Sequence, residues 1–224
     1  MKTATFITMI ILVIACNRQS EKTAGAGNDT LVINNKVYYL DSIPESVYNS
    51  VVYSFPGRGD TVSRDTSVVS ITVDRIIVKS AEKPVVFRND TSDTDTTARY
   101  EYKHTYGQLG FVHIQGLFYE WSSEFLINLK SGTKSEFWQA PLFSPGHKLV
   151  LSYSADLEGE MMANGIQLYK LENGEIVKVF ERELDKWEPE EIRWESDTSI
   201  VIRRAKLDSL DNKHIDFVRM RLKD

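Results

Sequence analysis

The sequence predicts a mainly β fold, an antiparallel β-meander with little helix, because its carboxyl-terminal half compares with itself. Residues 126–138 align without a gap on residues 168–180. Each segment has a strand, a polar turn ending in Gly, and a second strand ending in an aromatic residue, which is the pattern of a β-hairpin. Residues 143–152 align in the same way on residues 194–203, aromatic on aromatic and apolar run on apolar run. The region therefore consists of repeated antiparallel units.

The amino terminus differs in character from the rest of the chain. Residues 1–15 begin with the charged Lys2, continue with an apolar run of about ten residues, and are too short to span a bilayer. They predict a secretory signal peptide. Cys16, the single cysteine of the chain, follows directly. The sequence Val13-Ile14-Ala15-Cys16 resembles the lipobox of bacterial lipoproteins, and this resemblance implies cleavage before Cys16 and its acylation.

Residues 16–30 contain no apolar period and predict a flexible tether between the lipid and the folded part. The resemblance to lipoproteins implies that Asn17, which is not Asp, permits transfer to the outer membrane. Glu21 alone is a poor match to surface-export signals, so we expect the protein to face the periplasm.

Residues 31–224 are expected to form a single β-rich domain, with amino-terminal strands over 31–106. The segments 31–33 and 36–40, joined by two Asn residues, predict a hairpin with a two-residue turn. Ser42 and Glu45 have the spacing of a capping box, which predicts a short helix ending near Ser50.

Further strands are predicted between residues 51 and 106 from apolar and alternating patterns. They cover residues 51–55, 67–74, 75–79, 84–87 and 99–103. Residues 56–60 predict a turn, and its Arg58-Gly59-Asp60 tripeptide is interpreted as ordinary loop sequence. Tyr100 and Tyr102 should share one face of their strand.

Residues 107–224 are expected to hold blade-like repeats, since a period of roughly 40 to 50 residues with about four strands is typical of propeller blades. The segment Phe143-Ser-Pro-Gly-His-Lys-Leu149 is similar to a sequence motif of β-propeller blades of the TolB and WD-like kind. Two to two and a half blades cannot close a ring of four or more. We therefore expect an incomplete propeller or open meander, with exposed edges covered by the amino-terminal strands.

The sequence shows no recognisable catalytic constellation, phosphate loop or paired cysteines, so no catalytic residue and no cofactor is predicted. The four histidines are far apart, and His113, inside an apolar strand, is interpreted as a buried structural residue. Two acidic loops could offer oxygen ligands to a cation. We favour solvated loops over metal sites for both. The first has Asp90, Asp93 and Asp95; the second has Asp156, Glu158 and Glu160, with the Asn164 amide nearby.

Four tryptophans could form a sugar-stacking face. Trp138 and Trp194 occupy repeat positions shared with Phe180 and Phe143, so we expect them to pack in the core. Trp121 and Trp187 lie beside loops and are the candidate ligand-binding residues, provided that one of them is exposed.

These observations favour a non-catalytic envelope lipoprotein that binds another protein or acts as an accessory module. Its partners would be the membrane, through the lipid on Cys16, and a protein. The net charge of −5 argues against a nucleic-acid surface. The alternatives are a module that binds a glycan or another small ligand through Trp121 or Trp187 and, less favoured, a hydrolase built around His113.

Overall fold

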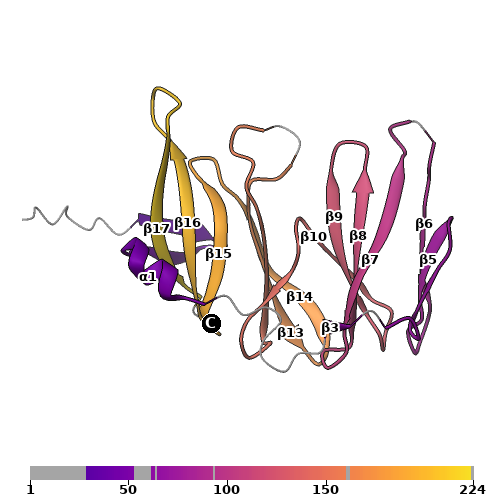
Figure 1. Cartoon of the computed structure of the whole chain (residues 1–224). Coiled ribbons are helices and arrows are strands. Elements are labelled where there is room, and N and C mark those ends of the chain that lie inside the picture. The colour runs from indigo at the N-terminus through magenta and orange to yellow at the C-terminus, as the bar shows by residue number, and fades with distance from the viewer. Residues whose placement is uncertain (1–28, 53–61, 64, 93, 160–161, 223–224) are drawn as a thin grey trace, which may run out of the picture.

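The computed structural model describes residues 29–52, 62–63, 65–92, 94–159 and 162–222, and it is mainly β, as predicted. Its strands form four antiparallel sheets that lie side by side in a row (Figure 1). We number these sheets I to IV along the row.

Sheets I and II lie at one end of the row and contain the strands between residues 62 and 137. Sheet I contains β4 (Val69–Ile71), β5 (Arg75–Val78) and β6 (Val85–Arg88). Sheet II has the order β10-β9-β8-β7-β3. Its strands are β3 (Val62–Ser63), β7 (Ala98–Tyr106), β8 (Phe111–Phe118), β9 (Ser122–Asn128) and β10 (Lys134–Phe137).

Sheets III and IV contain the carboxyl-terminal strands and the amino-terminal hairpin. Sheet III comprises β11 (Leu142–Phe143), β12 (Leu149–Ser154), β13 (Gly165–Glu172) and β14 (Glu175–Glu183). Sheet IV has the order β1-β2-β17-β16-β15. Its strands are β1 (Asp29–Ile33), β2 (Lys36–Ser42), β15 (Glu188–Ser196), β16 (Ser199–Leu207) and β17 (Lys213–Arg221).

The predicted repeats are paired antiparallel strands. The two aligned hairpins are β9 with β10 and β13 with β14, and the second aligned pair is β11 with β12 and β15 with β16. Among the described strands the sheets form an open row, with sheets I and IV at opposite ends (Figure 1). The likeness to an incomplete propeller is therefore loose, and it lies in the meandering sheets.

The amino-terminal strands cover sheet edges, as expected. Asn34 and Asn35 have φ values of 50° and 63°, which a two-residue hairpin turn requires, and β2 pairs with β17. β3 similarly adds to β7 in sheet II. The expected division between residues 106 and 107 falls in the turn between the paired strands β7 and β8, so it separates no structural unit.

A short helix follows β2, as predicted, but the capping box does not form. Helix α1 (Glu45–Ser50) has Pro44 at its N-cap and no side-chain cap hydrogen bond. Ser42 is still part of β2, paired with Val218, and cannot turn back to cap the helix. The strand predicted for 51–55 is not formed at residues 51–52, and its remainder, with Arg58-Gly59-Asp60, lies outside the described residues.

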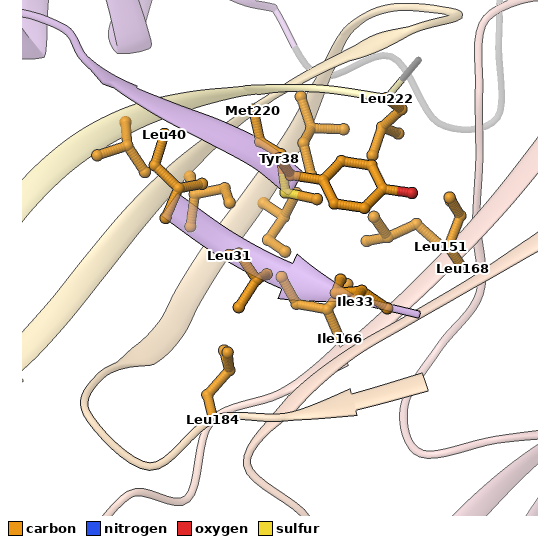
Figure 2. Packing of buried hydrophobic residues seen from close by; sticks show 14 of the residues in the cluster. Leu31, Ile33, Tyr38, Leu40, Leu151, Ile166, Leu168, Leu184, Met220 and Leu222 are labelled. Carbon is orange, nitrogen blue, oxygen red and sulfur yellow. The ribbon is translucent and has the colours of Figure 1, made fainter. Parts of the chain in front are cut away.

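Apolar side chains fill the space between successive sheets. Figure 2 shows part of the core between sheets III and IV, where Leu31, Tyr38 and Leu40 of the amino-terminal hairpin meet Leu151 and Ile166 of sheet III. Two further clusters lie between sheets I and II and between sheets II and III. Burial of this apolar surface supplies the main attraction that holds the row together.

A buried arginine ties the amino-terminal strand to the last two strands. The Arg204 side chain, 4% exposed, donates two hydrogen bonds to the Asp216 carboxylate, at 2.7 and 2.8 Å, and one to Asp29 at 2.6 Å. The buried charge is therefore paired on two sides, which a buried guanidinium needs. Through these contacts β1, β16 and β17 are fixed to one another.

If the amino-terminal hairpin is an integral part of the domain, truncating its buried side should destabilise the whole protein. Leu40 is 2% exposed and its neighbour Tyr39 is 54% exposed. We expect Leu40→Ala to lower the free energy of unfolding by about 2–5 kcal/mol, and Tyr39→Ala by less than about 0.5 kcal/mol. Urea unfolding curves of both variants measure this. Equal small losses would mean that the hairpin is only loosely attached.

Candidate functional site

The two candidate ligand-binding tryptophans have different environments. Trp121, directly before β9, is 46% exposed, whereas Trp187 is only 6% exposed in the core between sheets III and IV. The Arg204 guanidinium lies 5.3 Å from the centre of the Trp187 ring. The prediction that Trp187 could bind a ligand is therefore corrected, because its position beside a loop did not prevent its ring from packing inward.

The two tryptophans expected in the core, Trp194 and Trp138, also differ in their exposure to solvent. Trp194 is buried there, and its indole N–H donates to the Leu142 carbonyl at 3.0 Å. Trp138 is partly exposed instead, and its neighbour Phe137 is fully buried.

Unequal hairpin geometry explains this correction for Trp138. β13 and β14 are joined by only two residues, and their register shifts at a bulge beside Leu168, which places Phe180 opposite it. A longer loop joins β9 to β10, and no shift occurs in their described register. Residues that align in sequence therefore differ in facing, because one extra residue reverses the side of a strand on which a side chain lies.

Trp121 and Trp138 line one cleft of about 290 Å³, where the edge of sheet II meets the β12–β13 loop of sheet III. We call it the tryptophan cleft. Its other lining residues are Ser122, Ser123, Glu136, Met162 and Ala163. The Trp121 ring stacks on Phe118, with ring centres 3.9 Å apart and planes 19° apart, and the Ser123 hydroxyl donates to Glu136 at 2.8 Å. The cleft thus combines aromatic and hydrogen-bonding groups.

A second polar cluster is buried on the face of sheet II that points toward sheet III. His113 Nε2 lies 2.6 Å from a carboxylate oxygen of Glu124, and both side chains are at most 5% exposed. Gln115 donates to the other Glu124 oxygen at 2.9 Å, and His104 Nε2 lies 3.4 Å from His113 Nδ1. A carboxylate that orients an imidazole is a common part of acid–base catalysis. Here, however, both groups are buried, and a general base must reach its substrate.

The sequence indicated burial of His113 but did not identify its partner. The structure supplies the missing information through strand pairing: His113 is opposite Leu126 and Gln115 is opposite Glu124. The sequence signal for this buried cluster is the alternation of His113 and Gln115 with apolar neighbours along one strand. Without the register of β8 against β9, this signal could not identify Glu124.

The acidic loops do not supply a metal site within the described part of the chain. Among the described residues, no group of three or more His, Cys, Asp or Glu side chains is placed to hold an ion. The Asp156 carboxylate accepts the Met162 backbone N–H at 2.8 Å, and Glu158 lies in the same loop. Glu160 and Asp93 lie outside the described residues.

Three large apolar side chains are exposed on the outer face of the β1–β2 hairpin. Val32, Val37 and Tyr39 are 52%, 47% and 54% exposed, and Val32 is directly opposite Val37. They alternate along the strands with the buried residues that face sheet III. We call these three residues the hairpin patch. It lies on sheet IV at one end of the row, on the strands with which the described chain begins.

Comparisons with protein-family models, with curated proteins and with solved structures give no match. Within the described residues, no helix has both the length and the apolar character needed to cross a membrane. Proposals for function therefore depend on the chain's own residues.

The buried cluster predicts a pH dependence of stability. Burial, followed by the neighbouring His113 and Lys103, lowers the pKa of His104 to about 4, below the value of about 6.5 in an unfolded chain. The unfolded state therefore binds more protons between these values, so stability should fall as the pH drops from about 6.5 to about 4.

The variant His104→Gln should lose less stability than the native protein over this pH range. Urea unfolding at pH 7.5 and pH 4.5 gives the comparison, because other acidic groups contribute to both proteins. An identical loss in both would show that the pKa of His104 is the same in the folded and unfolded states.

Proposed function

We propose that the chain is a non-catalytic envelope lipoprotein, anchored through Cys16, that acts as a protein-binding or accessory module. The observation that carries this proposal is the hairpin patch of Val32, Val37 and Tyr39, an exposed apolar surface on the strands nearest the tether. Contiguous exposed apolar side chains are typical of interaction sites. The lipobox resemblance supports the anchor and a location in the outer membrane facing the periplasm.

The position of the hairpin patch suits a partner at the membrane. From Cys16 to Asp29 the chain can extend by no more than roughly 45 Å, so the anchored protein keeps β1 near the lipid surface. A protein held in or beside the same membrane could then meet the patch at a high effective concentration.

The edge of sheet IV offers a second means of binding. Among the described strands, β1 pairs with β2 on one side and is the outermost strand of the sheet order. Its other side presents backbone N–H and C=O groups to which an extended partner segment could add as a further strand. Side chains of that segment would then lie beside Val32 on the outer face.

Two features support a binding role over a catalytic one. The His113–Glu124 pair, the described arrangement that most resembles catalytic machinery, is buried. The Asp156 carboxylate of the second acidic loop already accepts a backbone hydrogen bond. The net charge of −5 supports a partner other than nucleic acid.

Acylation of Cys16 is tested by labelling with radioactive palmitate in a Gram-negative host. We expect the native protein to incorporate the label and to sediment with membranes, and Cys16→Ser to do neither. Ser20→Ala, in the same tether, is the matched control and should behave as the native protein does. Absence of label from the native protein would contradict the proposed anchor.

The hairpin patch is tested by photo-crosslinking in cells with a photoreactive amino acid at position 37 or at the control position 177. Val177 is 40% exposed on β14, which belongs to sheet III and not to the sheet that carries the patch. We expect one discrete crosslinked protein from position 37 and none from position 177. Its yield should drop at least tenfold when Tyr39→Asp is added. Equal crosslinking from both positions would exclude a specific partner at the patch.

A further inference from the structure

The exposed ring of Trp121 packs on a neighbouring aromatic ring. It stacks in near-parallel fashion on Phe118, with ring centres 3.9 Å apart, while its side chain remains 46% exposed. An aromatic side chain that is already fixed loses little conformational entropy when a ligand covers it. The Trp121 ring therefore offers a flat apolar surface in the lining of the tryptophan cleft.

The other walls of the cleft supply a second aromatic ring and hydrogen-bonding groups. Trp138 follows β10 and lines the cleft, and its backbone N–H donates to the Gln167 side chain at 2.9 Å, which fixes the chain at this point. Glu136 and Ser123, joined by a hydrogen bond of 2.8 Å, add carboxylate and hydroxyl oxygens, and Ser122 adds a further hydroxyl. Apolar faces and polar groups thus border the same space.

We propose that the tryptophan cleft is a binding site for a neutral pyranose sugar. A pyranose ring has C–H faces that pack on aromatic rings and equatorial hydroxyls that bond to carboxylate and hydroxyl groups. The cleft meets both requirements, because it has aromatic residues and a few polar groups around one space. This combination is typical of small-molecule sites.

The dimensions and charge of the cleft restrict the ligand further. Its volume of about 290 Å³ is at the lower end of the range for small-molecule sites, which fits one sugar ring at a time. Its charged lining residue is the acidic Glu136, and the described lining contains neither Lys nor Arg. A uronic acid or a phosphorylated sugar would place a negative charge beside that carboxylate, so neutral sugars are preferred.

The site is separate from the proposed partner surface. The tryptophan cleft lies between sheets II and III, and the hairpin patch lies on the outer face of sheet IV. Loss of one function therefore need not affect the other.

The experiment measures binding of defined sugars to the protein purified from membranes in mild detergent. The neutral probes are glucose, galactose, mannose, N-acetylglucosamine, cellobiose and tri-N-acetylchitotriose, and glucuronic acid is the charged probe. We expect at least one neutral probe to give saturable calorimetric binding and to protect tryptophan fluorescence from acrylamide quenching. Glucuronic acid should bind at least about tenfold more weakly than glucose if glucose binds.

Variants connect this binding to the cleft. Trp121→Ala and Trp138→Ala should each weaken the affinity about tenfold, as expected for the loss of a stacking contact. Trp121→Phe, which keeps an aromatic face, should lose less. Tyr119→Ala is the matched control, because Tyr119 is 64% exposed two residues before Trp121 and does not line the cleft.

Three results would overturn the proposal. The first is a flat response of the native protein to every neutral probe at concentrations up to tens of millimolar. The second is unchanged affinity in Trp121→Ala. The third is equal loss in Tyr119→Ala. Circular dichroism and urea unfolding identify any variant that fails to fold, and Trp121→Phe then supplies the comparison.

Discussion

The structure depends on apolar contact between the faces of neighbouring sheets, completed at one end by the pairing of β2 with β17. Along β1 and β2 every second side chain enters the core between sheets III and IV, which leaves the intervening ones in solvent. The same alternation that stabilises the row therefore also creates the hairpin patch. Arg204 fixes this arrangement through its two carboxylate partners.

Local patterns were sufficient to predict most of the individual elements. The paired Asn residues marked the first hairpin, and the self-alignment of the carboxyl-terminal half located the later ones. Tyr100 and Tyr102 do pack in one cluster, as alternation predicted. The placement of β2 beside β17 and of β3 beside β7 was expected only in general terms, because pairing between distant strands has no local sequence pattern.

The candidate sites show where sequence reasoning failed. Trp138, expected in the core, is partly exposed, because strand facing changes with a single bulge or an added loop residue. Trp187, expected beside a loop, has its ring in the core. Trp121 is exposed, which its candidacy as a ligand-binding residue requires, but its contact with Phe118 and its neighbour across the cleft depend on tertiary packing. The Glu124 partner of His113 likewise depends on strand register, which hydrophobic periodicity leaves open.

The pairing of β2 with β17 also affects the order in which the protein can be assembled. The first strands of the domain complete their sheet with the last one, so the β1–β2 hairpin must wait for nearly the whole chain before it can dock. Contacts between such distant segments close late in folding, because a long loop must be ordered first. A chain threaded amino terminus first across a membrane would thus keep its leading segment undocked until translocation is nearly finished.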